Sequence, residues 1–295
     1  MKHHGVQLPD PFPEAFRAAL QQLVGGASRI EGDRIDATRA RRRQLAQSGV
    51  FTGHRPYVGG DDLRRIDWNA YARSGGLFVK LLEEEEPRAS AVVIDTSATV
   101  LAGSPPRWTG MLRLAAIAGG LSLRHLDALR LVAGGTELRL TGARSLPQLL
   151  DRLRRLEPGA AESPRAVVER MLDGGNPGRV HWISHFAEPA ALEPALRVLR
   201  RHAVRATGVL PLVPDDRDIV LRGWVMVTDP ASGRRERVAV DAAMAQEMRR
   251  QLTLLARQQD IVFGRSGAQL VRFELPAETD HSLAAWKEAA WTFRR

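Results

Sequence analysis

The chain has 295 residues, no cysteine and a formal net charge of +9. The lack of cysteine excludes disulfide bonds and thiolate metal sites, and the length allows one large domain or two smaller ones. The longest apolar run, Leu114–Leu123, is about half of a membrane-spanning length, and no apolar signal segment follows Met1. We therefore expect a cytoplasmic protein without a membrane span.

The first predicted element is a helix over Pro11–Leu23, for which Asp10 is a suitable N-cap. The polar stretch that follows carries a basic cluster, Arg39–Arg43. Nearly all of the 43 basic residues are arginines, which allows a nucleic-acid-binding function through an Arg-rich face. We prefer the interpretation that this charge is dispersed and solvated, because no aromatic residue is interleaved in the cluster for base stacking.

A block rich in charged and aromatic residues runs from Arg55 to Arg73, with a predicted turn at Gly59-Gly60. Opposite charges this close together predict a partly buried network of ion pairs, because buried charges must be paired. An acid–base role for its aspartates is the weaker alternative, since neighbouring arginines hold carboxylates ionised. The residues of this structural or partner-binding block are Arg55, Tyr57, Asp61, Asp62, Arg64, Arg65, Asp67, Trp68 and Arg73.

Two strands are predicted after this block. An apolar strand over Leu77–Leu82 leads into the acidic run Glu83–Glu86. The short β-branched run Ala91–Ile94 is typical of a parallel strand that is buried on both faces. Ligands bind at the carboxyl ends of such strands in open α/β sheets. The candidate site is therefore the loop that carries Asp95, Ser97 and Thr99.

The rest of the chain alternates between helical and strand patterns, which predicts a mostly parallel sheet covered on both faces. Helices are predicted over Arg107–His125, Leu146–Leu156, Pro164–Leu172, Pro189–His202, Ala242–Gln259 and Ser282–Phe293. Strands are predicted over Leu129–Ala133, Glu137–Leu140, Arg179–Ser184, Val204–Leu210 and Ile261–Phe263, and a second hairpin over Val220–Thr228 and Arg235–Val240.

These features together resemble a bacterial family, the domain of unknown function 58 family. The resemblance rests on Tyr57–Trp68, which reads Y-V-G-G-D-D-L-R-R-I-D-W, on Ala72-Arg73, Leu77, Val79 and Glu83–Glu86, and on I-D-T-S at Ile94–Ser97. It implies an α/β fold: a von Willebrand factor A-like (Rossmann-like, mostly parallel sheet) domain over residues 89–295, with a hairpin insertion near 220–240. A smaller N-terminal region of residues 1–88, with a small sheet, would precede it.

The resemblance also implies a function. Proteins of this family are typically found beside MoxR-type AAA+ ATPases, so the resemblance implies a non-catalytic adaptor that works with such an ATPase in assembling or remodelling a client protein. It implies no known catalytic activity.

A divalent-metal site is a further implication of the resemblance. Such a domain holds the ion with an Asp-x-Ser-x-Ser loop, a Thr from a second loop and an Asp from a third, and hard oxygen ligands suit Mg²⁺. Asp95, Ser97 and Thr99 supply the first loop, with Thr in place of the last Ser.

The other two metal loops match poorly. Gly134-Gly135-Thr136 mimics the second loop, but the order of elements puts that loop at residues 158–163, with Ala161 in place of the Thr. In the third loop His185 replaces the Asp and becomes a candidate partner-binding residue. We therefore expect no cofactor, or weakly bound Mg²⁺. A metal-dependent hydrolase at Asp95 stays as an alternative function.

Overall fold

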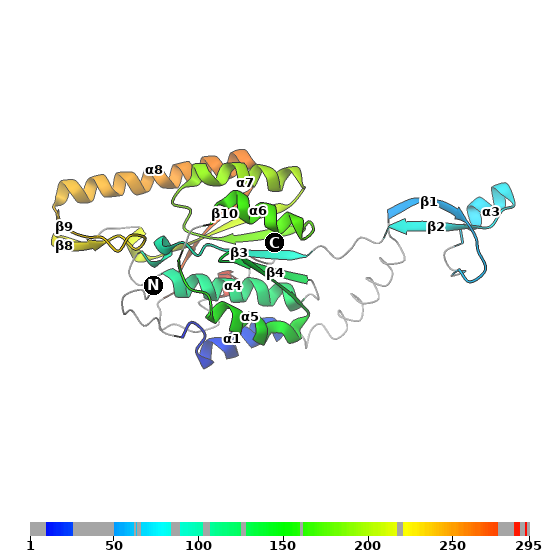
Figure 1. Cartoon of the computed structure of the whole chain (residues 1–295), viewed down its shortest axis with the longest axis horizontal. Coiled ribbons are helices and arrows are strands. Elements are labelled where there is room, and N and C mark those ends of the chain that lie inside the picture. Colours follow the sequence, from blue (N-terminus) through cyan, green and yellow to red (C-terminus); the bar gives the residue numbers. More distant parts are fainter. Residues whose placement is uncertain are drawn as a thin grey trace. The chain divides into compact units, whose positions relative to one another are not determined.

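A computed structural model describes residues 10–25, 50–61, 63, 66–83, 89–102, 107–124, 128–159, 162–216, 221–276, 286–289 and 293 (Figure 1). The chain divides into two compact units. The larger unit combines Met1–Gly26 with Arg88–Arg295, and the smaller unit is Ala27–Pro87.

The larger unit is built on a six-stranded sheet. Its strands are β3 (Ser90–Ile94), β4 (Ala128–Ala133), β5 (Thr136–Thr141), β6 (Arg179–Ile183), β7 (Arg205–Leu212) and β10 (Gln269–Glu274). The order across the sheet is β10-β7-β6-β3-β4-β5, and of these six strands only β5 runs antiparallel to its neighbour. The predicted α/β class with a mostly parallel central sheet is confirmed.

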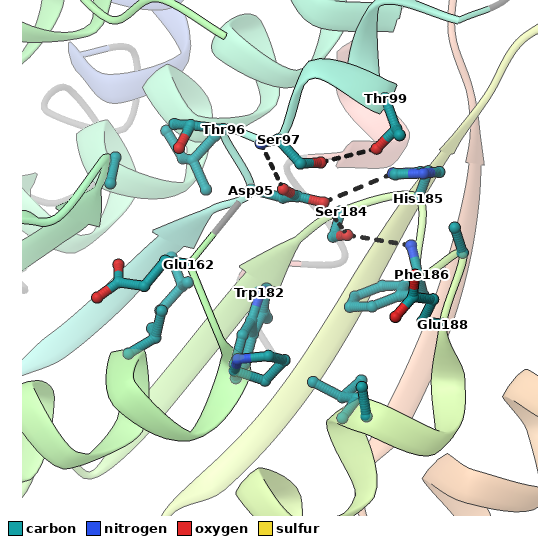
Figure 2. A pocket seen from close by; sticks show the side chains of 18 of the residues that line it. Asp95, Thr96, Ser97, Thr99, Glu162, Trp182, Ser184, His185, Phe186 and Glu188 are labelled. Carbon is teal, nitrogen blue, oxygen red and sulfur yellow. Dashed lines mark hydrogen bonds and ion pairs between the residues drawn. The ribbon is translucent and has the colours of Figure 1, made fainter. Parts of the chain in front are cut away.

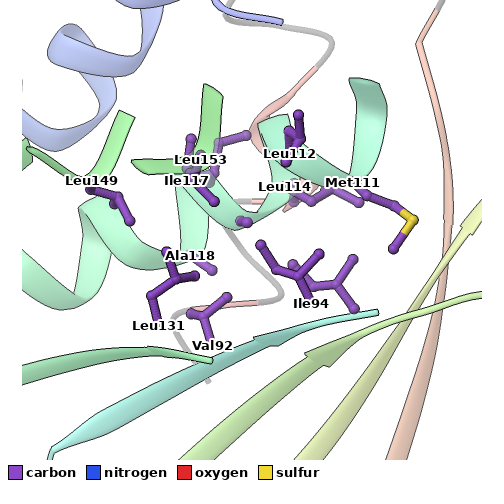
Figure 3. Packing of buried hydrophobic residues seen from close by; sticks show 14 of the residues in the cluster. Val92, Ile94, Met111, Leu112, Leu114, Ile117, Ala118, Leu131, Leu149 and Leu153 are labelled. Carbon is purple, nitrogen blue, oxygen red and sulfur yellow. The ribbon is translucent and has the colours of Figure 1, made fainter. Parts of the chain in front are cut away.

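Helices cover both faces of this sheet (Figure 1). One face carries α1 (Glu14–Gly25), α4 (Arg107–Arg124) and α5 (Leu146–Arg154), and the other carries α6 (Pro164–Asp173), α7 (Pro189–Arg201) and α8 (Ala242–Ser266). Residues 107–123 of α4 are all buried, because the sheet lies on one side of this helix and α1 and α5 lie on the other. Figure 3 shows Met111 and Ala118 of α4 facing Val92 and Ile94 of β3.

The strand order reverses between β3 and β6. From β3 the chain moves to β4 and β5 on one side, and it then returns to β6 on the other side of β3. In open α/β sheets, ligands bind outside the carboxyl ends of the strands at such a switch point. Asp95 and Ser184 are the residues that directly follow these two strands. Short 3-10 turns, η2 (Ala98–Leu101), η3 (Ala143–Ser145) and η4 (Pro214–Asp216), complete the connections.

The predicted hairpin near 220–240 is present as β8 (Gly223–Thr228) and β9 (Arg235–Val240). It leads into α8, which runs back towards the start of β10. The Gln259 side chain of α8 donates hydrogen bonds to the loop that follows β6. This contact places Gln259 beside the carboxyl edge of the sheet. Residues 242–258 of α8, about 25 Å of helix, precede this point. We call β8, β9 and residues 242–258 the arm.

Two elements differ from the sequence prediction. The strand predicted at Ile261–Phe263 is wrong, because these residues continue α8, where Val262 and Phe263 pack into the core. Gly267, with φ +67, ends that helix in the left-handed region that glycine favours. The true edge strand is β10, which the sequence prediction left out.

The first helix also lies elsewhere than predicted. The sequence grouped it with the N-terminal region of residues 1–88, whereas α1 belongs to the larger unit. The physical reason is its apolar face: Phe12, Phe16 and Leu20 are buried in the same core as α4. Of the predicted final helix, residues 286–289 are helical and residue 293 is in helical conformation.

In the residues of the smaller unit that the structure describes, there are the small predicted sheet and one short helix. β1 (Val50–Pro56) and β2 (Phe78–Glu83) pair antiparallel, and α3 (Trp68–Ser74) lies between them in sequence. Asp67 caps α3, and Ile66 forms a β-bridge with Val79. The Arg55–Arg73 block is thus attached to β2 by backbone pairing.

Candidate functional site

A pocket of about 230 Å³ opens at the switch point of the larger unit (Figure 2). The loop after β3, the end of β4, the start of α6 and the loop between β6 and α7 all contribute to it. The predicted residues Asp95, Ser97, Thr99 and His185 all line this pocket. The structure therefore brings together residues that the sequence had placed on two separate loops.

Asp95 is held by its neighbours on both carboxylate oxygens. Its Oδ1 accepts a hydrogen bond of 2.8 Å from the Ser97 amide, and its Oδ2 accepts one of 2.7 Å from Ser184 Oγ. Nδ1 of His185 lies 3.5 Å from the same Oδ2 atom, within ion-pair distance. The Asp95 amide donates to the carbonyl of Ile183, which ties the loop to β6.

These contacts fix the charge of Asp95. Burial alone would raise the pKa of this carboxyl group, but His185, Ser184 and the Ser97 amide stabilise the carboxylate, and they lower its pKa to about 2. A carboxyl group with this pKa is an anion across the physiological range and is poorly matched to proton transfer near neutral pH. Asp95 thus acts as a fixed negative charge.

The loop that carries His185 is held in place by α8. Ser184 Oγ accepts a hydrogen bond of 3.0 Å from the Phe186 amide, and Phe186 adopts φ +48, a left-handed conformation uncommon outside glycine. Gln259 of α8 is buried, and its Nε2 donates to the carbonyls of His185 and Phe186 at 3.2 and 3.1 Å. The Phe186 ring packs edge-on against Phe263. This loop is therefore braced from the base of the arm.

The hydroxyl groups of the predicted metal loop bond to each other. Ser97 Oγ and Thr99 Oγ1 are 2.8 Å apart, and Figure 2 shows both beside Asp95. Mg²⁺ requires near-octahedral oxygen donors with free lone pairs. Here Asp95 accepts from the Ser97 amide and Ser184 Oγ, the Ser97 and Thr99 hydroxyls bond to each other, and His185 rather than a carboxylate faces Asp95 Oδ2. One carboxylate and two hydroxyls supply only part of the oxygen shell that Mg²⁺ prefers, so this loop alone does not fit the ion.

The mimic of the second metal loop has a different role. Gly134 and Gly135, with φ +55 and +75, form the tight turn between β4 and β5. The Thr136 hydroxyl donates a hydrogen bond to the carbonyl of Ala133, and Thr136 does not line the pocket. Near the position expected for that loop, Gly159 pairs with the first loop by donating a 2.7 Å hydrogen bond to Thr96. Ala161 lies outside the described residues.

Three functional positions were missed in the sequence. Ser184 follows a buried strand directly, which is the signal that identified Asp95, but the prediction included it in the strand. Glu162 lines the pocket and contacts Arg170. Gln259 gave no signal, because its partners are 73 and 74 positions away in the sequence.

The charged block lies in the smaller unit and is partly paired as predicted. Arg55 and Asp61 form a bidentate pair at 2.6 and 2.7 Å, which lowers the pKa of Asp61 to about 2. Asp67 contacts His54 Nε2 at 2.8 Å and accepts hydrogen bonds from the amides of Asn69 and Ala70.

Two aromatic residues of the block, Trp68 and Tyr71, are exposed, whereas Asp67 is buried. The Trp68 ring is 62% exposed and packs edge-on against Tyr71. Tyr57 is half-buried, and Arg73 is exposed and donates to the carbonyl of Asn69. Asp62, Arg64 and Arg65 lie outside the described residues.

Geometry and fold define an α/β protein with a pocket at its topological switch point. A family model described as "Protein of unknown function DUF58" matches residues 53–261, and the chain belongs to this family. A comparison with curated proteins finds no match. In the described part of the chain, no helix is long and apolar enough to cross a membrane.

Solved structures give distant similarities. The chain is similar to the conserved hypothetical protein BatB from Bacteroides thetaiotaomicron, with a TM-score of 0.41 and 11% identity over 70% of this chain and 98% of that chain. It is also similar to an aerotolerance-related membrane protein from Bacteroides fragilis NCTC 9343, with a TM-score of 0.40 and 15% identity over the same shares of each chain. At this level of similarity, neither structure carries an argument about function.

Proposed function

We propose that this protein is a non-catalytic adaptor whose larger unit is a von Willebrand factor A-like domain. In this proposal it binds a MoxR-type AAA+ ATPase and presents a client protein to it, as the family resemblance implies. The partner would contact the carboxyl edge of the sheet, where the arm and the pocket beside Asp95 lie together.

The observation that carries the proposal is the apolar surface of the arm. Trp224 and Met226 of β8 are 66% and 61% exposed, and Met244 on the first turn of α8 is exposed as well. Two-stranded hairpins are marginal on their own in water, and large exposed apolar side chains in one place mark interaction sites. The buried residues of α8 lie mostly in its last two turns, so most of the arm is free to contact a partner.

The fixed charge of Asp95 is the second support. A residue that stays ionised between pH 5 and pH 8 contributes to recognition rather than to proton transfer. We also propose that partner binding does not depend on a divalent cation at this site, because the Ser97 and Thr99 hydroxyls bond to each other and His185, not a second carboxylate, faces Asp95 Oδ2.

The test begins with tagged protein purified from its native cells, followed by reconstitution with the purified MoxR-type ATPase. We expect the ATPase to co-purify and to bind with a defined stoichiometry by calorimetry. Recovery of nucleic acid in its place, with salt-sensitive binding, would support the Arg-rich alternative and contradict the adaptor.

Metal dependence needs a separate design, because the ATPase itself uses Mg²⁺ with its nucleotide. Ionic conditions are therefore held constant, and the double variant Ser97→Ala/Thr99→Ala is compared with the parent. We expect less than a tenfold change in partner affinity, equivalent to about 1.4 kcal/mol. A larger loss, together with Mn²⁺ binding by the parent alone, would show that a working metal site exists.

A further inference from the structure

We propose that the pocket beside Asp95 binds the cationic end of a basic side chain, an arginine or lysine that the partner protein contributes. This inference rests on the proposed function, because the partner that contributes the basic side chain is the partner of the proposed adaptor. It assigns the pocket a ligand of positive charge, whereas a metal-bearing site at this position would take a carboxylate.

The shape of the pocket suits a side chain that is apolar along its length and charged at its tip. Its floor is formed by Val132 of β4, Val167 of α6, Trp182 of β6 and Leu192 of α7, all of them buried. Arginine and lysine bury their aliphatic stems against such surfaces and keep the charged group at a polar rim. Mixed pockets with an apolar floor and a few placed polar groups are the usual form of ligand sites.

The rim of the pocket is acidic although the whole chain carries +9. Asp95, Glu162 and Glu188 line the pocket, and no arginine or lysine is among the described residues that line it. Glu162 is engaged by Arg170, whereas Glu188 is exposed and forms no ion pair within the described part of the chain. Asp95 contacts His185 Nδ1 at 3.5 Å (Figure 2), and among the described residues that line the pocket neither Asp95 nor Glu188 is paired with an arginine or lysine.

Helix dipoles reduce this negative charge but do not cancel it. The N-termini of α6 and α7 face the same edge, and each is equivalent to roughly half a positive charge. Two such ends offset about one of the two negative charges of Asp95 and Glu188. A net negative charge stays at the mouth of the pocket, so an incoming carboxylate is repelled and a guanidinium or ammonium group is attracted.

The contacts around Asp95 hold its carboxylate in a fixed orientation, which favours binding of a cationic group. Ser97, Ser184 and His185 contact the carboxylate from the loops after β3 and β6, and the Gln259 side chain holds the latter loop from behind. A cation at the rim therefore meets a carboxylate that needs little reorganisation. Preorganised charge of this kind gives selectivity for the sign of the ligand.

The experiment uses the full chain and blocked single amino acids as probes. N-acetyl-arginine N-methylamide is titrated into isotope-labelled protein, and the amide signals of Ser97, Thr99 and His185 are followed by NMR. We expect saturable shifts at these residues in the millimolar range, weakened by added salt. Blocked glutamine and blocked glutamate are expected to give no saturable shifts there.

Matched variants locate the interaction. Glu188→Gln removes an exposed charge from the rim, and Glu169→Gln removes an exposed charge of α6 outside the pocket. We expect the first to weaken binding of the arginine probe roughly threefold and the second to leave it unchanged.

Two results would overturn the inference: glutamate shifting the same amides as strongly as arginine, or the two variants behaving alike. Failure of the adaptor hypothesis alone is distinguishable from these results. In that case the arginine probe would still bind this pocket, but no ATPase would co-purify with the protein.

Discussion

Ser184 Oγ donates a hydrogen bond of 2.7 Å to Asp95 Oδ2, and this bond joins the ends of β3 and β6 across 89 positions of sequence. Ser184 Oγ also accepts a hydrogen bond from the Phe186 amide. Ser184 and its hydrogen bond to the Phe186 amide are buried, whereas Asp95 is partly exposed to the pocket. The Ser184 hydroxyl group thus adds a side-chain link to the backbone pairing of the two strands that define the switch point.

Ser184→Ala is expected to destabilise the larger unit by about 1–3 kcal/mol, because it removes the acceptor of the buried Phe186 amide and one of the hydrogen bonds to Asp95. The free energy of unfolding in urea measures this effect. Ser145→Ala is the matched control: its hydroxyl bonds to the carbonyl of Thr141 at a solvent-accessible position, and a change below about 0.5 kcal/mol is expected. Equal effects of the two substitutions would contradict the role given to Ser184.

Acid sensitivity is the second prediction. The pKa of Asp95 falls from 3.8 to about 2 on folding, so its contribution to stability is fully present above pH 3.8 and is lost as the pH falls through 2. Between pH 5 and pH 2 the parent should lose about 2 kcal/mol more than Asp95→Asn, which has no group to titrate at this position. Parallel pH profiles of the two proteins would show that the carboxylate is not stabilised by its neighbours.

The sequence located the site because its signals are local. A short β-branched strand that ends on Asp95 predicts a buried parallel strand with a polar loop at its carboxyl end, and the structure places that loop at the switch point. His185 was found through the family resemblance, as the residue that replaces the Asp expected in the third metal loop. Local pattern is sufficient wherever one strand and its own loop determine the position.

What the sequence did not predict depends on distant packing. The apolar residues Ile261–Phe263 suit a strand as well as a helix, and only their burial against the core after a long exposed helix decides between the two. Likewise, Gln259 bonds to a loop 73 and 74 positions away, which no local pattern reveals. The satisfaction of the Ser97 and Thr99 hydroxyls by each other is a matter of side-chain geometry rather than of spacing.

The smaller unit provides a third prediction. Asp67 Oδ1 accepts from the amides of Asn69 and Ala70 and so caps α3, while Oδ2 contacts His54. Asp67→Ala removes an N-cap worth about 1 kcal/mol, and hydrogen exchange of the amides of residues 68–74 should accelerate. Asp67→Asn keeps an acceptor for the helix, so its exchange rates should stay close to those of the parent. If alanine and asparagine give the same rates, the cap does not stabilise this helix.

The last prediction concerns Trp224 on the arm. Its ring is 66% exposed and lies 4.6 Å from the Arg237 guanidinium, a cation–π contact on the surface of the hairpin. Exposed tryptophans dominate binding energy at many protein interfaces while adding little to the stability of the free protein. Trp224→Ser should therefore change the free energy of unfolding by less than about 1 kcal/mol.

The same substitution should weaken ATPase binding at least tenfold, or about 1.4 kcal/mol. Trp68→Ser is the matched comparison, because Trp68 is 62% exposed but belongs to the smaller unit. Calorimetric titration of the purified ATPase with each variant decides between the two surfaces. A loss of affinity with Trp68→Ser and none with Trp224→Ser would transfer the partner surface from the arm to the Arg55–Arg73 block.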